Sequence, residues 1–98
     1  MVANGARGEV VAGLAGAERR LCLTLGALAE IETGLELDGL SGLAERMRAL
    51  SARDLTVVLA ALLRGGGERA LADDLDRAPV DPREAGEAVA KAFAAAAR

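Results

Sequence analysis

The strongest constraint on the fold is a stripe of large apolar residues that recurs with helical spacing in the second half of the chain. The stripe follows the pattern i, i+3, i+4, i+7, i+8 that defines one face of an amphipathic helix, and its members are Leu55, Val58, Leu59, Leu62 and Leu63. Ser51 and Asp54 precede it with capping-box spacing, and the glycines at 65–67 follow it. We therefore expect a helix from Ser51 to about residue 64 at the centre of the fold, with Leu59 nearly inaccessible to solvent.

The N-terminal quarter has a different period. Residues 1–8 show none, and we expect a flexible arm there. Beyond Glu9 the apolar residues alternate in two runs, which is typical of half-buried strands, and these residues are Val10, Ala12 and Leu14, then Leu21, Leu23 and Leu25. Gly16 lies between the runs and supplies the positive φ that a tight turn requires. The pattern predicts a β-hairpin at about residues 8–24.

The remaining segments read as helices. One follows the hairpin and ends near Gly34, and a short one is capped by Ser41, with an apolar stripe of Leu43, Met47 and Leu50. A polar helix at residues 68–77 is stopped by Pro79, and the sequence from Asp81 to Glu84 begins a last helix that runs to the C-terminus. The predicted fold class is α+β: an N-terminal hairpin followed by about four short α-helices, mostly helical, in a single domain at residues 9–98.

The core of such a domain has to be built almost without aromatic rings. Phe93 is the only aromatic residue, so packing depends on Leu, Val, Ile and many Ala side chains. Phe93 itself falls on the apolar side of the last helix, together with Val89, and we expect it in the core. The alternative is that Val89 and Phe93 form a docking stripe for a partner helix.

The residues needed for most enzyme chemistry are missing. The chain has no His and no Tyr, and its single cysteine, Cys22, lies between leucines, where a buried structural thiol is expected. Ser41 and Ser51 stand where helix caps are expected. The acidic cluster at 73–76 fits a solvated helix face, since an EF-hand loop would require Gly at the position of Ala78. We expect no enzyme activity, no cofactor, no metal site and no small-molecule substrate.

Charge and hydropathy also limit the partners. The net charge is −3 and the arginines are scattered among acids, which disfavours nucleic-acid binding, although a helix-turn-helix exposing Arg53 and Arg64 is the alternative. The longest strongly apolar run, residues 55–63, is far below the roughly 20 residues of a membrane-spanning helix. Residues 1–8 lack the apolar region of a secretory signal, so we expect a cytoplasmic protein without membrane or nucleic-acid partners.

Several segments resemble one family, the tail assembly chaperones of gene transfer agents and related tailed phages, whose genes lie beside the tail tube gene. The most specific segment is Leu-Thr-Leu-Gly-Ala-Leu-Ala-Glu at residues 23–30, and further similarity covers residues 7–10, 21–32, 51–67 and 81–85. The sequence departs from the family pattern in the hairpin. Ala15 stands where a polar turn residue is usual, and Ala12 where a larger apolar residue is usual.

The resemblance implies a tail assembly chaperone that binds the tape measure protein and the tail tube protein, and it transfers no individual site residue. The rival interpretation is a structural minor tail or tail tube-associated component that stays in the particle. The residue patterns agree in kind with protein binding. A helix groove suits an amphipathic partner helix, and a hairpin edge suits an added strand.

Overall fold

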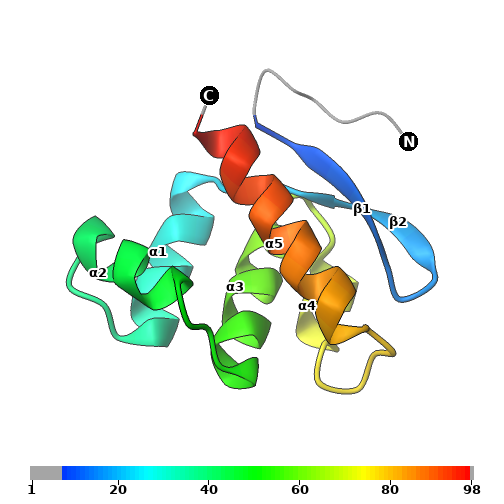
Figure 1. The fold of residues 1–98 in the computed structure, drawn as a ribbon. Helices are drawn as coiled ribbons and strands as arrows, with labels where there is room; N and C mark the ends of the chain where they lie inside the picture. Colours follow the sequence, from blue (N-terminus) through cyan, green and yellow to red (C-terminus); the bar gives the residue numbers. More distant parts are fainter. Residues whose placement is uncertain (1–7, 98) are drawn as a thin grey trace.

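The computed structural model describes residues 8–97, which form a two-stranded antiparallel sheet and five helices (Figure 1). In chain order these are β1 Val10–Leu14, β2 Ala17–Leu21, α1 Leu25–Leu35, α2 Leu40–Met47, α3 Ala52–Gly65, α4 Arg69–Asp73 and α5 Pro82–Ala96. The predicted hairpin and the mostly helical α+β class are confirmed, and the five helices fall on the five helical segments read from the sequence, against a predicted total of about four. The expected flexible arm lies outside the described residues except for Gly8.

Helix α3 is the central element of the fold, as its apolar stripe predicts. It contacts α1, α4, α5 and β2, and it lies between the other helices in Figure 1. Six consecutive residues of α3, from Val58 to Leu63, are buried, and Leu59 is only 2% exposed. The Ser51 hydroxyl accepts the Asp54 N–H at 3.1 Å, and the Asp54 carboxylate accepts the Ser51 N–H, so the predicted capping box is present. The sequence interpretation of this helix is confirmed.

The hairpin turns on two residues. Leu14 pairs with Ala17, and the intervening Ala15 and Gly16 both have positive φ, 53° and 79°. Gly16 therefore has the predicted role, whereas Ala15 adopts a conformation that a Cβ atom disfavours. The second strand ends at Leu21, earlier than the alternation suggested.

The predicted end of the hairpin near residue 24, with a helix beyond it, is confirmed, although Leu25 also fitted the alternation of the strand. Thr24 ends the extended segment because its hydroxyl accepts the Ala27 N–H at 3.0 Å and caps α1. Leu25 becomes the first residue of that helix and is 86% exposed.

Helix boundaries that depend on neighbouring elements also differ from the predictions. Helix α1 passes Gly34 and ends at Leu35, with Glu36 in the left-handed conformation. Gly34 is required for packing instead, since a Cβ there would collide with Val57 of α3. The expected Ser41 cap is wrong, because Gly39 holds the cap position two residues earlier, α2 begins at Leu40, and Ser41 makes no capping hydrogen bond.

Two further segments are shorter than predicted. Helix α2 stops at Met47 rather than Leu50. The polar helix predicted for residues 68–77 is reduced to the five residues of α4, and the chain then turns on itself. The Asp74 N–H donates to the Leu71 carbonyl three residues back and closes α4, and a single further turn follows, in which the Arg77 and Ala78 N–H groups donate to the Asp74 carbonyl.

The glycine run has a packing role beyond ending α3. A Cβ at Gly65 would overlap the Cys22 carbonyl, and one at Gly66 would overlap the Arg20 carbonyl. The backbone of the β2 end therefore lies directly against the end of α3, where the Cys22 N–H donates to the Leu62 carbonyl at 3.0 Å.

Helix α5 begins as predicted, with Asp81 as the cap and Pro82 at the first helical position. It packs on α3 and β1 (Figure 1).

Candidate partner-binding surfaces

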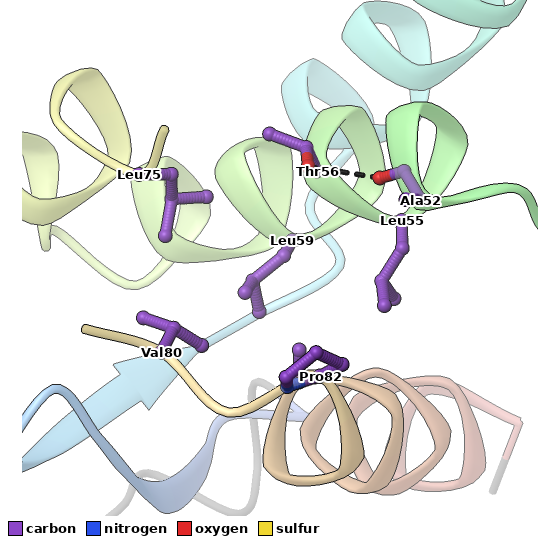
Figure 2. Close-up of a pocket in the computed structure, with 8 residues that line it drawn as sticks. Ala52, Leu55, Thr56, Leu59, Leu75, Val80 and Pro82 are labelled. Atoms are coloured by element: carbon purple, nitrogen blue, oxygen red, sulfur yellow. Dashed lines mark hydrogen bonds between the residues drawn. The ribbon is translucent and has the colours of Figure 1, made fainter. Parts of the chain in front are cut away.

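An apolar pocket of about 130 Å³ lies between α3, the start of α5 and the segment that joins α4 to α5. In Figure 2, Leu75 and Val80 lie on one side, Leu55 and Pro82 on the other, and Leu59 between them. Ala52, Thr56 and Ala85 complete the lining. The Thr56 hydroxyl donates to the Ala52 carbonyl at 2.9 Å, so it is already satisfied within α3. The lining side chains therefore offer a surface for an apolar group.

The residues interleaved with this lining are mostly acidic. Asp74, Asp76, Asp81 and Glu84 are all exposed and are balanced only by Arg77 and Arg83, which gives residues 74–84 a formal charge of −2. Asp74 forms an ion pair with Arg77 at 2.9 Å, whereas the Asp81 carboxylate accepts the backbone N–H of Arg83 at 2.8 Å as the cap of α5 and keeps its charge. Asp76 and Asp81 adjoin the lining residues Leu75, Val80 and Pro82 and keep their negative charges there, whereas Glu84 lines a second depression with Glu87 and Lys91.

The two residues singled out from the sequence are placed differently. Val89 is 2% exposed and belongs to the core, whereas Phe93 is half-buried and packs against that core. Of the two, only Phe93 presents surface that another protein can contact. A docking stripe that uses both side chains would therefore require α5 to move, and it stays a hypothesis.

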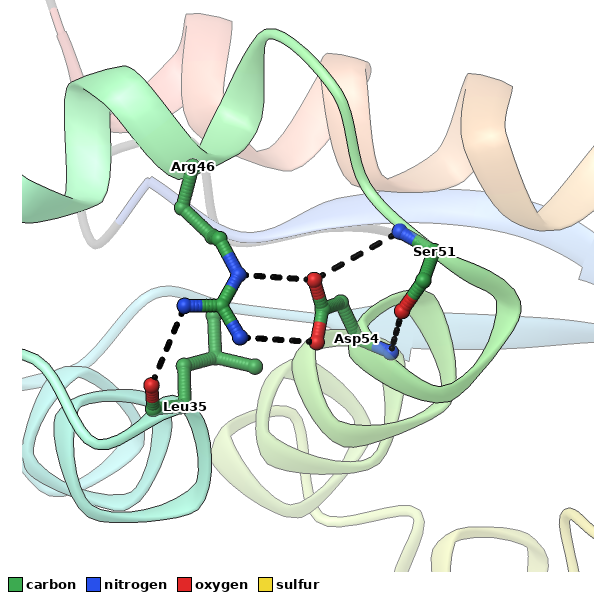
Figure 3. Close-up of polar contacts among 4 residues, drawn as sticks. All are labelled: Leu35, Arg46, Ser51 and Asp54. Atoms are coloured by element: carbon green, nitrogen blue, oxygen red, sulfur yellow. Dashed lines mark hydrogen bonds and ion pairs between the residues drawn. The ribbon is translucent and has the colours of Figure 1, made fainter.

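A polar network ties α1, α2 and α3 together on the other side of α3 (Figure 3). The Arg46 guanidinium donates to both carboxylate oxygens of Asp54, at 2.8 and 3.2 Å, and to the Leu35 carbonyl at 3.2 Å. The hydrogen bonds from Arg46 lower the pKa of Asp54 below its usual range, burial opposes this shift, and the Ser51 N–H adds to it. The capping box was predicted from the sequence. The Arg46 contact was not, because it depends on how α2 turns back.

Arg64 of α3 is held by two carboxylates, Glu30 of α1 and Asp73 of α4, the latter at 3.0 Å. The helix-turn-helix alternative required Arg64 to face nucleic acid together with Arg53. The engagement of Arg64 by two acids opposes that alternative.

The hairpin edges are partly covered by side chains from later parts of the chain. The Arg20 N–H of β2 donates to the Glu68 carboxylate at 3.0 Å, and the Lys91 ammonium of α5 donates to the Val11 carbonyl of β1 at 2.7 Å. Gly13 is the exposed part of the β1 edge. Strand addition is therefore restricted to a short stretch near the turn.

Cys22 is 1% exposed, which confirms its predicted burial. Within residues 8–97 no three His, Cys, Asp or Glu side chains gather closely enough to hold a metal ion. The described helices include none that combines the length and the apolar character needed to cross a membrane.

A family model described as phage tail tube protein, GTA-gp10, matches residues 7–98. No curated protein and no solved structure matches the sequence. The match covers nearly the whole chain, including the hairpin, all five described helices and the pocket between α3 and α5. The chain therefore belongs to the phage tail tube protein GTA-gp10 family.

Proposed function

We propose that this protein is a tail assembly chaperone of a gene transfer agent, which binds the tape measure protein, the tail tube protein or both while the tail is built. It acts in the cytoplasm and leaves before the particle is complete. Membership of a phage tail family supports a role in the tail, and the sequence resemblance to tail assembly chaperones supports a transient one.

The observation that carries this proposal is how few large apolar side chains are exposed on the surface. Among the described residues the exposed large apolar side chains are Leu25 and Leu40, and they belong to the starts of different helices. Permanent interfaces between subunits are usually large and apolar, while transient ones are more polar. A subunit held between two neighbours would bury about 800 Å² in each contact. The two contacts together would cover about 1,600 Å², roughly a quarter of its accessible surface of 5837 Å². A surface on which only two large apolar side chains are exposed among the described residues suits reversible binding better.

The second candidate is a structural component that remains attached to the tail tube. The family description, phage tail tube protein, favours it directly. The two candidates differ in a simple way, because only the structural component is present in finished particles.

The test combines a deletion strain with analysis of purified particles. For a chaperone we expect the deletion strain to produce capsids without tails by electron microscopy, and we expect mass spectrometry to find no peptides of this protein in wild-type particles. Restoring the gene in trans should restore tails. Normal tails in the deletion strain would refute any assembly role, and stoichiometric peptides in mature tails would establish the structural candidate.

A further inference from the structure

We propose that the pocket between α3 and α5 receives one aliphatic side chain, of leucine or methionine size, from an amphipathic partner helix with basic residues beside that anchor. This inference rests on the proposed function and names the chemistry of the bound partner. It uses the pocket of Figure 2 and the acidic residues around it.

The size of the pocket selects the anchor. Its volume is about 130 Å³. An apolar cavity of about 150 Å³ holds a benzene-sized molecule, so this pocket accepts one aliphatic side chain and not a cluster. Leu55, Leu75 and Val80 are only half-buried, so their apolar surface faces water when the pocket is empty. An entering methyl-rich side chain removes that surface from water, which favours binding.

The shape of the mouth selects a helix. Four lining residues come from α3 at positions 52, 55, 56 and 59, which is the i, i+3, i+4, i+7 row of a single helix face. Such a row forms a ridge and groove against which a second helix packs its own side chains. Recognition of an amphipathic helix by an apolar groove follows the same spacing.

The charge of the rim selects a basic partner. Residues 74–84, which form one side of the pocket, carry a formal charge of −2, and Asp76 and Asp81 within them are exposed and adjoin the lining residues Leu75, Val80 and Pro82. Arg53, the cation of α3 nearest to Ala52 in sequence, lines a separate depression with Leu35 and Arg46. Lys or Arg side chains on a partner helix complement the negative rim, while Glu or Asp side chains are repelled by it.

The experiment is a titration of the full chain with peptides, in which the methyl and amide NMR signals of the protein are recorded at each step. The probes are two synthetic peptides of about 18 residues, long enough to form a helix on binding, with the same leucine pattern and either Lys or Glu on the flanks. We expect the Lys peptide to bind saturably and to shift the methyl signals of Leu55, Leu75 and Val80. We expect the Glu peptide to bind at least about tenfold more weakly at about 50 mM salt, with the difference shrinking at about 500 mM.

Matched variants separate the pocket from the rest of the surface. Ala52→Leu fills the mouth from an exposed position and should weaken the Lys peptide about tenfold, whereas Ala90→Leu, an exposed position outside the pocket, should not. The double variant Asp76→Lys, Glu84→Lys should reverse the preference between the peptides. The control pair Asp38→Lys, Glu45→Lys, in the joining segment before α2 and in α2 itself, should leave it unchanged.

Three results would overturn the inference. They are equal binding of both peptides, equal effects of Ala52→Leu and Ala90→Leu, or pocket shifts that change on dilution without peptide, which would identify a second copy as the occupant. Failure of the pocket and failure of the assembly role are distinguishable. If the deletion strain lacks tails but the pocket binds neither peptide, only the proposed role of the pocket is refuted. If the pocket binds the Lys peptide but the deletion strain makes normal tails, the assembly role is refuted.

Discussion

Ala15 occupies a left-handed backbone conformation, with φ of 53°, in a turn whose second residue, Gly16, also has positive φ. Turns of this kind favour Asn-Gly, because asparagine tolerates the left-handed region better than alanine. We predict that Ala15→Asn raises the free energy of unfolding by about 0.5–1 kcal/mol. Urea denaturation followed by circular dichroism measures the change.

The matched control is Ala17→Asn, which places the same side chain at an exposed strand position two residues later. Asparagine is disfavoured in strands, so this variant should be neutral or less stable. An Ala15→Asn protein no more stable than the parent would contradict the strain assigned to Ala15.

At the level of helices, the contact between α2 and α3 makes stability depend on pH. Arg46 lowers the pKa of Asp54 in the folded state, so unfolding raises that pKa again. The stabilisation is therefore fully present above the pKa of an unfolded aspartate, near 3.9, and is lost as pH falls through the lower folded value. We predict that Asp54→Asn flattens the acid limb of a plot of unfolding free energy against pH, as measured by urea denaturation between about pH 2 and 6.

Asp38→Asn provides the comparison for this measurement. Asp38 is exposed between α1 and α2 and lacks a hydrogen-bond or ion-pair partner among the described residues. Its substitution should leave the acid limb almost unchanged. Identical profiles for the two variants would show that the Arg46–Asp54 contact does not persist in solution.

For the molecule as a whole, stability depends on the buried face of α3. Leu59 is 2% exposed, and Leu59→Ala should lower the free energy of unfolding by about 2–5 kcal/mol. Leu25→Ala changes the same side chain at an 86% exposed site and should cost less than about 0.5 kcal/mol. Chemical denaturation of both variants measures the difference. A loss below about 0.5 kcal/mol for Leu59→Ala would mean that α3 is not central.

Features that depend on nearby residues were predictable from the sequence. The caps at Ser51 and Asp81 and the turn at Gly16 are local, since each is set by residues within three positions. Other features needed the three-dimensional arrangement. Gly34 looks like a helix stop but serves the approach of Val57, and nothing in the spacing of Arg46 and Asp54 indicates that they meet.

The pocket also combines features that the sequence predicts with features that depend on the three-dimensional arrangement. Leu55 and Leu59 were placed on one helix face by their period alone. Their meeting with Leu75, Val80 and Pro82 depends on how α4 ends and how α5 begins, and a pocket is the space that such packing leaves unfilled. The hydrophobic period of a single segment cannot predict a pocket whose lining comes from three segments.

The docking of β2 on the end of α3 has a consequence for synthesis on the ribosome. The carboxylate that accepts the Arg20 N–H belongs to Glu68, which is synthesised 48 residues later. An isolated two-stranded hairpin is only marginally stable in water. At translation rates of about 5–20 residues per second, the nascent hairpin spends roughly 2–10 s before that partner is made. Throughout this interval α5, which packs on β1 in the finished fold, has not been made, so the hairpin with its buried Leu14 lacks that part of its native cover. The first two strands to be synthesised are thus among the last elements to gain their native cover.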